Sequence, residues 1–312
     1  MRFAFVLCLA VLADGILGDP RNLPHPVRFI GHVITFWHKT LFIGNDSFVR
    51  GLAVVVMTLM TAGLLVAGVL YVSGCNVIVQ VYLLYSAIAW RDLKDETRPV
   101  YLALLSHDLT NARKYLAFVV GRDTESLSET EIVRAVIETV AENSVDGVMS
   151  VLFFAAMGHV MGGDYGACVG VWVFKSASTL DSMLGYESLG RYGTASARLD
   201  DMLNFIPARL GGVIIVMAGV FAGGGIKVRE GWRVFVSDRL RHKSPNSAHG
   251  ESAFAGVLGV RLGGGAYYGG EFEARAWLNE SARDPEAGDI VRAWRVLDGA
   301  CVIGVMLAGS MI

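Results

Sequence analysis

Three carboxylates lie close together in the stretch "VIETVAENSVDG", at Glu138, Glu142 and Asp146. A strongly apolar run, "VMSVLFFAAMGHVMGG", begins immediately afterwards at Val148. On a helix, the four-residue steps from Arg134 to Glu138 and Glu142 stack these side chains on one face. The stretch is therefore either a solvated helix face with an Arg–Glu pair or part of a site that handles charge.

Further acidic and basic side chains flank later apolar runs. Carboxylate and amide oxygens are the hard ligands that Mg²⁺ prefers, usually with waters and phosphate oxygens. Arginines can clamp phosphates through paired hydrogen bonds. The residues of these types in "STLDSMLGYE" and "SARLDDMLNFIPARL" are Asp181, Arg198, Asp200, Asp201, Asn204 and Arg209. Together with the first stretch they indicate a site for a metal ion and a phosphate.

A polar loop near the start of the chain adds a third group. "DGILGDPRNLPHPVRFIG" places Asp19, His25 and Arg28 around three prolines, which exclude helix and stiffen the loop. A purely structural role for His25 stays open. The common phosphate-binding loop is not matched, because "GVWVFKS" has Phe174 where that motif needs a glycine.

The composition indicates a membrane protein. The 312 residues are 53% hydrophobic and 18% charged, with a mean hydropathy of +0.48. An ordinary soluble domain carries about a quarter charged residues. The formal charge of −2 argues against a nucleic-acid partner, because proteins that follow phosphate backbones carry an excess of basic residues.

Several runs approach the ~20 apolar residues that a spanning helix needs. They are residues 3–17, 51–73, 76–90, 148–162, 165–180, 208–226 and 295–312. The first of them has an alternative reading as a signal peptide, although Asp14 interrupts it.

Charge in the linkers predicts the orientation of these spans. We expect 51–73 with 76–90, and 148–162 with 165–180, to form hairpins, since neither connector holds Lys or Arg. The basic linkers 18–50, 91–147 and 181–207 then share one side, which the positive-inside rule makes cytoplasmic. A full crossing by 208–226 would put the basic stretch 227–291 outside, so either 208–226 is re-entrant or a segment near 252–268 enters the membrane.

The fold class expected is all-α: a polytopic helical membrane protein with cytoplasmic helical loops, organised as one membrane domain over 1–312. The large cytoplasmic loop, about 91–147, is predicted to be helical. "YLALLSHDLTNARKYLAFVVG" has apolar residues at helical spacing up to a terminal glycine. Ser128 and Glu131 form a capping box that opens a second helix at 129–143.

The longest of these stretches resemble the CobD/CbiB family. They are "LGDPRNLPHPVRFIG", "ARKYLAFVVGRDTESLSETEIVRAVIETVAENSVDGV", "TLDSMLGYE", "ASARLDDMLNFIPARL" and "SPNSAHGESAFAGVLGVRLGG". They occur in the family's order over about residues 12–270. Members of this family are membrane-bound adenosylcobinamide-phosphate synthases of cobalamin biosynthesis.

The resemblance implies an enzyme of the inner (cytoplasmic) membrane, with its active face cytoplasmic. It would be a ligase that uses ATP and Mg²⁺ to join the amine of aminopropanol phosphate, or aminopropanol, to adenosylcobyric acid. The corrinoid is a substrate, the lipid bilayer is a partner, and other membrane enzymes of the pathway are candidate partners. The alternatives are a membrane transporter and an AmpE-like sensory or accessory protein.

The resemblance also implies the site. Glu138, Glu142, Asp146 and Asp201 are expected to be catalytic and to hold Mg²⁺ with phosphate, and one carboxylate is expected to accept the amine proton. The residues expected to bind substrate or nucleotide are Asp19, His25, Arg28, Arg122, Asp123, Thr124, Asn143, Asp181, Arg198, Asp200, Asn204, Arg209, Pro245 and Asn246.

Overall fold

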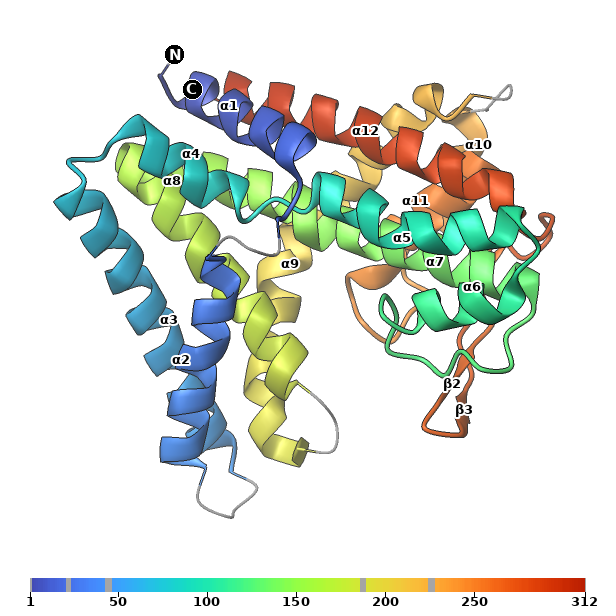
Figure 1. Cartoon of the computed structure of the whole chain (residues 1–312), viewed down its shortest axis with the longest axis horizontal. Coiled ribbons are helices and arrows are strands. Elements are labelled where there is room, and N and C mark those ends of the chain that lie inside the picture. Colours follow the sequence, from blue (N-terminus) through green and yellow to red (C-terminus); the bar gives the residue numbers. More distant parts are fainter. Residues whose placement is uncertain (1, 21–23, 43–46, 186–188, 224–227, 312) are drawn as a thin grey trace. The chain divides into compact units, whose positions relative to one another are not determined.

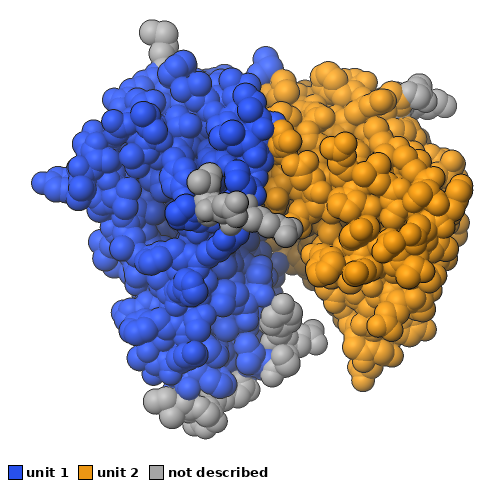
Figure 2. Space-filling view, viewed as in Figure 1, with its two compact units in different colours: residues 1–88, 150–205, 305–312 blue, residues 89–149, 206–304 orange. Residues whose placement is uncertain are grey.

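Helices make up almost the whole chain in a computed structural model, which describes residues 2–20, 24–42, 47–185, 189–223 and 228–311 (Figure 1). The chain divides into two compact units. Unit 1 comprises residues 1–88, 150–205 and 305–312, and unit 2 comprises 89–149 and 206–304 (Figure 2). The all-α expectation is confirmed, whereas the single membrane domain over 1–312 stays a prediction.

Unit 1 is built around long apolar helices. Its elements are α1 (Arg2–Leu17), α2 (Pro26–Leu41), α3 (Phe48–Val72), α4 (Val77–Tyr85), α8 (Ser150–Leu184) and the first part of α9 (Gly190–Ala218). The α3 helix packs on α2 and α8, and α4 packs on α1 and α8. With 25 residues, α3 is about 38 Å long, enough to cross the hydrocarbon core of a bilayer.

The α8 segment is a helical hairpin rather than one straight rod. Gly162 and Gly163 leave helical geometry, and Gly163 has a φ of 59°. The chain turns back there, so that the rings of Phe154 and Phe174 stack with their centroids 4.8 Å apart. This confirms the hairpin predicted from 148–162 and 165–180.

Close packing of the two hairpin arms predicts a strong effect at Gly158. A Cβ added there would collide with the carbonyl oxygen of Gly166, which belongs to the facing backbone and cannot rotate away. Gly158→Ala is expected to lower the unfolding free energy by at least ~1–3 kcal/mol, the usual cost of overpacking. Thermal unfolding in detergent measures it. The matched control is Gly68→Ala in α3, where an added Cβ meets nothing within 4 Å; equal melting temperatures for the two variants would contradict the prediction.

Three helical stretches of the described chain are long and apolar enough to cross a membrane: Phe48–Val72, Glu129–Leu184 and Gly190–Phe221. The prediction of a spanning helix at 76–90 is wrong. There, α4 has nine residues and ends at Tyr85. The helix does not continue to residue 90, since the backbone N–H of Ala89 donates to the Gly147 carbonyl at 3.1 Å and not to a carbonyl one turn earlier. The predicted spans 3–17 and 295–312 are helical, within α1 and α12 (Ala287–Ser310), but neither helix meets the length and hydropathy required.

The polar linker predicted at 181–207 is also largely wrong. Helix α9 begins at Gly190 and carries Arg198, Asp200 and Asn204 with Pro207 inside it. These side chains are therefore held on a long helix rather than on a loop.

Unit 2 packs around α7 (Glu129–Ser144), which lies against α5 (Trp90–Leu105), α6 (Leu109–Leu116) and α11 (Ser247–Leu258). The capping box of Ser128 and Glu131 is present, as predicted. The chain does not stop after α7: it continues through a π-helical turn, Val145–Met149, into α8. The predicted helix end at 143 is therefore wrong: Asn143 lies within α7, and Asp146 lies in the π-helical turn that continues it.

A single helix over 101–121 was expected and is not found. His107 has a φ of 56°, and Asp108 caps the new helix α6 by accepting from the Asn111 amide at 3.0 Å. A cap and a left-handed residue thus separate α5 from α6.

The rest of unit 2 is α10 (Val228–Asp238), two small antiparallel pairs and most of α12. Strand β1 (Leu262–Gly263) pairs with β4 (Trp277–Leu278), and β2 (Ala266–Tyr268) pairs with β3 (Glu271–Glu273). The α11 helix, near which a membrane segment was considered, is buried in this unit from Ala248 to Leu258, so it is a core helix.

Candidate functional site

Helix α7 brings Glu138 into a buried ion pair in unit 2. Arg122 Nη2 lies 2.7 Å from Glu138 Oε2, and the two side chains are only 12% and 7% exposed. The backbone N–H of Gly263 donates to Glu138 Oε1 at 2.7 Å. Both carboxylate oxygens therefore have a partner. A buried charge is tolerated in a fold when it is paired and hydrogen-bonded in this way. Glu138 does not pair with Arg134, which instead lies 3.8 Å from Glu131.

One turn further along α7, Glu142 remains accessible to solvent. Its Oε1 accepts a hydrogen bond from Ser247 Oγ at 3.3 Å, at the start of α11. The charges of Arg275, Glu138 and Arg122 all act on this carboxylate. Glu142 is therefore the part of the cluster that a ligand can reach.

The structure adds a third carboxylate that sequence reasoning missed. Glu251 lies four residues after Ser247 on α11 and is 5% exposed. Within the described chain its carboxyl group has no hydrogen-bond partner. Burial raises its pKa well above the ordinary range, and the negative charges of Glu138 and Glu142 raise it further, although Arg275 and Arg122 act in the opposite sense. In the sequence, the signal for this buried carboxylate is a glutamate within "GESAFAGVLG", a stretch made mostly of small and apolar residues.

Residues from the β2–β3 region complete the cluster. Arg275 Nη2 donates to the Tyr268 hydroxyl at 2.7 Å, and its guanidinium lies 5.4 Å from the centre of that ring. Burial lowers the pKa of His242, and the charge of Arg275 lowers it further. We call Arg122, Glu138, Glu142, Glu251 and Arg275 the carboxylate–arginine cluster.

Asp123, predicted to bind substrate, holds the β2–β3 hairpin in place. Its two oxygens accept from the backbone amides of Gly269 at 3.1 Å and Gly270 at 2.7 Å. Its own N–H donates to the Tyr267 carbonyl at 2.8 Å. Both glycines have positive φ, which suits them to this tight turn.

We expect Asp123→Ala to loosen this hairpin. Losing two charge-assisted hydrogen bonds, each worth ~1.5–3 kcal/mol, should speed amide hydrogen exchange at Gly269 and Gly270 by at least about tenfold. Exchange followed by mass spectrometry reports it, with Asp108→Ala as the control, since that carboxylate caps α6 instead. Unchanged exchange in the hairpin would show that other contacts hold it.

The first predicted loop forms a separate group in unit 1. His25 Nε2 lies 3.7 Å from Asp19 Oδ1, and His25 Nδ1 caps α2 by accepting from the Val27 amide. Burial lowers the pKa of His25, Asp19 raises it, and the charges of Lys175 and Arg28 lower it again. Lys175 follows Phe174 in the stretch "GVWVFKS", and it lies inside helix α8 rather than in a phosphate-binding loop.

A second group in unit 1 centres on Asn204, which is 1% exposed. Its Nδ2 donates to Asp200 Oδ2 at 3.1 Å, and its Oδ1 accepts from Ser150 Oγ at 2.6 Å. Asp200 and Asn204, four residues apart on α9, are therefore paired on one face of the helix.

The other predicted residues are distributed between the units. Asp181, Arg198 and Asp201 belong to unit 1; Thr124, Asn143, Asp146, Arg209, Pro245 and Asn246 belong to unit 2. Thr124 and Asn246 are buried, and Pro245 is exposed. Arg209 lies where its charge acts on Arg239 and on the buried imidazole of His249.

In the described part of the chain, no three His, Cys, Asp or Glu side chains converge closely enough to hold a metal ion by themselves. Mg²⁺ in phosphate chemistry uses one or two protein carboxylates, and phosphate oxygens and waters supply the rest. An accessible Glu142 near a buried Glu251 is compatible with a metal ion whose remaining ligands are phosphate oxygens and waters. The four-carboxylate set with Asp146 and Asp201 stays a prediction, since Asp201 belongs to unit 1.

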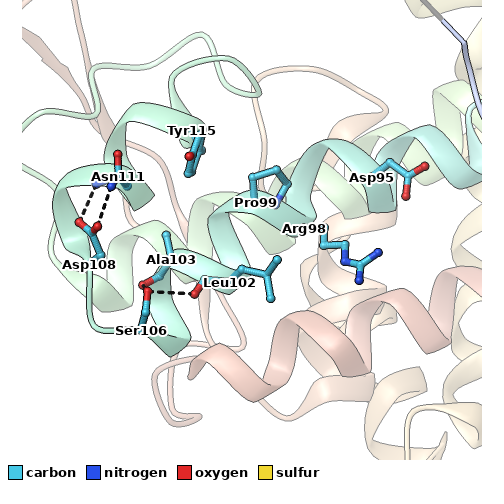
Figure 3. Close-up of a pocket in the computed structure, with 9 residues that line it drawn as sticks. All are labelled: Asp95, Arg98, Pro99, Leu102, Ala103, Ser106, Asp108, Asn111 and Tyr115. Carbon is cyan, nitrogen blue, oxygen red and sulfur yellow. Dashed lines mark hydrogen bonds between the residues drawn. The ribbon is translucent and has the colours of Figure 1, made fainter.

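A recess of about 550 Å³ lies between α5 and α6 (Figure 3). Its lining residues are Asp95, Arg98, Pro99, Leu102, Ala103, Ser106, Asp108, Asn111 and Tyr115. Both Asp108 oxygens are held by Asn111, at 3.0 Å and 2.6 Å. The recess shares no lining residue with the carboxylate–arginine cluster, and we assign it no part in the chemistry.

The fold and the cluster define a predominantly helical membrane protein in which glutamates of α7 and α11 interact with arginines from the neighbouring loops. The family described as CobD/Cbib protein matches residues 7–297, and the chain therefore belongs to the CobD/CbiB family. It is 42% identical to a cobalamin biosynthesis protein CobD of Pelobacter propionicus, over 89% of this chain and 85% of that one. It is 37% identical to a cobalamin biosynthesis protein CbiB of Salmonella arizonae, over 96% and 94%. No solved structure matches the chain.

Proposed function

We propose that this chain works in cobalamin biosynthesis as an ATP-dependent ligase that makes adenosylcobinamide phosphate, or adenosylcobinamide. The relatives named above are cobalamin biosynthesis proteins. The observation that carries the proposal is the carboxylate–arginine cluster, in which three glutamates and two arginines interact within unit 2. Such a set suits a reaction in which phosphoryl charge is moved and a proton is accepted.

The reaction has two steps. The free propionate of adenosylcobyric acid attacks the γ-phosphate of ATP, which gives an acyl phosphate and ADP. The amine of aminopropanol phosphate, or aminopropanol, then attacks the acyl carbon and expels inorganic phosphate. The nitrogen loses a proton as the amide bond forms, so the site must supply a group that accepts it.

The cluster offers a residue for each need. Arg275 and Arg122 would stabilise the charge that develops on the transferred phosphoryl group. Mg²⁺, where bound with the nucleotide, would neutralise phosphate oxygens, and Glu142 is the accessible carboxylate that would hold it. Glu138, with both oxygens occupied, would position Arg122.

Glu251 is the residue we assign to proton acceptance. A base works best with a pKa near the working pH, and burial moves the pKa of Glu251 upward from the ordinary glutamate range. Its unpartnered carboxyl group can turn toward a substrate.

This role gives a pH prediction. Because Glu251 must be ionised to accept a proton, the rate should fall as the pH falls through its raised pKa. Glu251→Gln is expected to remove that dependence and to lower the rate about 10²-fold. Rates measured across the pH range with saturating ATP check this. A variant that keeps both the wild-type rate and the wild-type acidic limb would place the base elsewhere.

The function itself is tested by condensation in a purified, reconstituted system. The protein, reconstituted in phospholipid bilayers, is incubated with adenosylcobyric acid, ATP, Mg²⁺ and either aminopropanol or its phosphate. The mass of the corrinoid product is then measured by mass spectrometry. We expect a new amide only when ATP is present, with one ADP formed per amide. A transporter would instead move a solute across sealed vesicles without forming the amide, and that result would overturn the proposal.

We further propose that the protein is a multi-pass protein of the inner membrane with its active face cytoplasmic. The three candidate spans support membrane insertion. The Lys and Arg residues in 18–47 and 91–128, outside those spans, support the cytoplasmic orientation. A membrane-impermeant thiol reagent should label Glu142→Cys only after the membrane has been permeabilised so that the reagent reaches the cytoplasmic side.

A further inference from the structure

Helix α10 has two different apolar faces. The inner face, with Gly231, Val234 and Phe235, is buried against α11. A Cβ added at Gly231 would lie 2.7 Å from the Val257 side chain, so the two helices are in close contact. The inner face is therefore fully used in the packing of unit 2.

The outer face carries a second stripe that nothing in the described chain covers. Trp232, Val236 and Leu240 follow one another at four-residue steps, on the helix and just beyond its end. They are 47%, 47% and 69% exposed. A tryptophan at the edge of such a stripe is typical of the membrane interface, where its ring meets both lipid and water.

Basic side chains surround this outer stripe. In residues 227–243, Lys and Arg outnumber Asp and Glu by six to two. Arg229 lies in the first turn of α10, Arg233 lies at its middle, and Arg239 and Arg241 follow its end. Charges at both ends cannot both enter the hydrocarbon, so the helix fits a bilayer only when it lies parallel to the surface.

A polar groove runs beside the stripe, one residue further around the helix. It has a volume of about 410 Å³. Arg233, Ser237, Asp238 and Arg241 line it, with Asn279, Glu280 and Ser281 on its other side, so two carboxylates balance its two guanidinium groups. Arg233 is paired with Glu230, and Arg241 Nε lies 3.3 Å from Asp238 Oδ1. Both guanidinium groups are still about half exposed or more and have further N–H donors for a phosphate.

The position of α10 in the chain agrees with a membrane surface. It packs against Gly219–Phe221, the last turn of the candidate span Gly190–Phe221. The charge of Arg239 acts on Arg209, nine residues before the end of α9 at Ala218. The chain thus folds back beside α9 after the span.

We propose that α10 is an interfacial helix that binds the phospholipid bilayer. Its stripe of Trp232, Val236 and Leu240 enters the boundary between headgroups and acyl chains, and the exposed guanidinium groups of Arg233 and Arg241 contact lipid phosphates. In this arrangement α10 and residues 208–221 lie on the same side of the bilayer, so 208–221 does not cross it completely. The conflict with the positive-inside rule that a full crossing by 208–226 creates is then absent.

The test measures where the stripe lies relative to lipid. The full-length protein, with Cys8 and Cys75 replaced by serine, carries Val236→Cys and an environment-sensitive fluorophore at that position. It is reconstituted into bilayers of phosphatidylethanolamine and phosphatidylglycerol, with or without a lipid that bears a quencher near the headgroup. We expect strong quenching by the lipid-borne group and at least fivefold weaker quenching by aqueous iodide than at Glu125→Cys, an exposed control position in a loop of unit 2.

A second variant tests the groove. Arg233→Gln combined with Arg241→Gln should reduce lipid quenching at residue 236 at least twofold, because the phosphate contacts that hold the helix down are weakened. Equal iodide quenching at 236 and 125 would overturn the proposal. Protection from iodide without lipid quenching would also overturn it, since another protein surface would then cover the stripe.

Discussion

Glu142→Gln is expected to lower the rate of ATP-dependent amide formation by about 10³-fold while leaving the fold intact. The substitution removes one negative charge at the accessible end of the carboxylate–arginine cluster. A preorganised charged group that acts on the charge developing in the transition state commonly supplies an effect of this size. The fold should persist because the glutamine carbonyl can still accept the hydrogen bond from Ser247.

The control for this experiment lies on the same helix. Glu129→Gln changes an exposed glutamate in the first turn of α7 and should leave the rate unchanged. Nucleotide affinity is measured in parallel, since loss of a metal ligand should weaken binding of Mg·ATP as well as the rate. Full activity and ATP binding in both Glu142→Gln and Asp201→Asn would show that neither carboxylate handles the phosphate.

Helix α7 shows what the sequence could predict. Its start depends on contacts within four residues, since Ser128 and Glu131 cap each other. Local patterns of this kind are visible in any sequence. The hairpin of α8 was predictable for the same reason, because two glycines interrupt two apolar runs.

Features that depend on distant contacts were not predictable. The partner of Glu138 is Arg122, sixteen residues away, rather than Arg134 at helical spacing. Arg275 follows strand β3 and joins the cluster after the β2–β3 hairpin, whose turn is held by hydrogen bonds to Asp123. Glu251 resembles a core residue in sequence, and only its burial beside Glu138 and Glu142 makes it a candidate base.

Boundary errors had one physical source. The start of α9 at Gly190 was missed because its first turns are polar, and a hydropathy window finds only the apolar half of a long helix. As a result Asp200, Asp201 and Asn204 were placed in a linker. On the helix, Asp200 and Asn204 are held in fixed register by the hydrogen bond between them.

Arg122→Leu is expected to destabilise the protein by ~3–5 kcal/mol, because Glu138 would then be a buried charge without its cation. The Gly263 amide would still donate to Glu138, but one hydrogen bond cannot replace the guanidinium. Unfolding in mild detergent, followed by the loss of helical circular dichroism, measures the change. Lys114→Leu, which removes an exposed cation of helix α6, should be neutral and serves as the control.

The double variant Arg122→Leu/Glu138→Leu separates charge from packing. Replacing both members of a buried pair by apolar residues is often neutral, so the double variant should be more stable than either single variant. The Gly263 amide loses its acceptor, which keeps a residual cost of ~1–3 kcal/mol. Activity should nevertheless be absent from the double variant, because the arginine that we assign to phosphoryl charge is gone. Strictly additive losses of stability would mean that the two side chains are not coupled, and an active double variant would remove Arg122 from the chemistry.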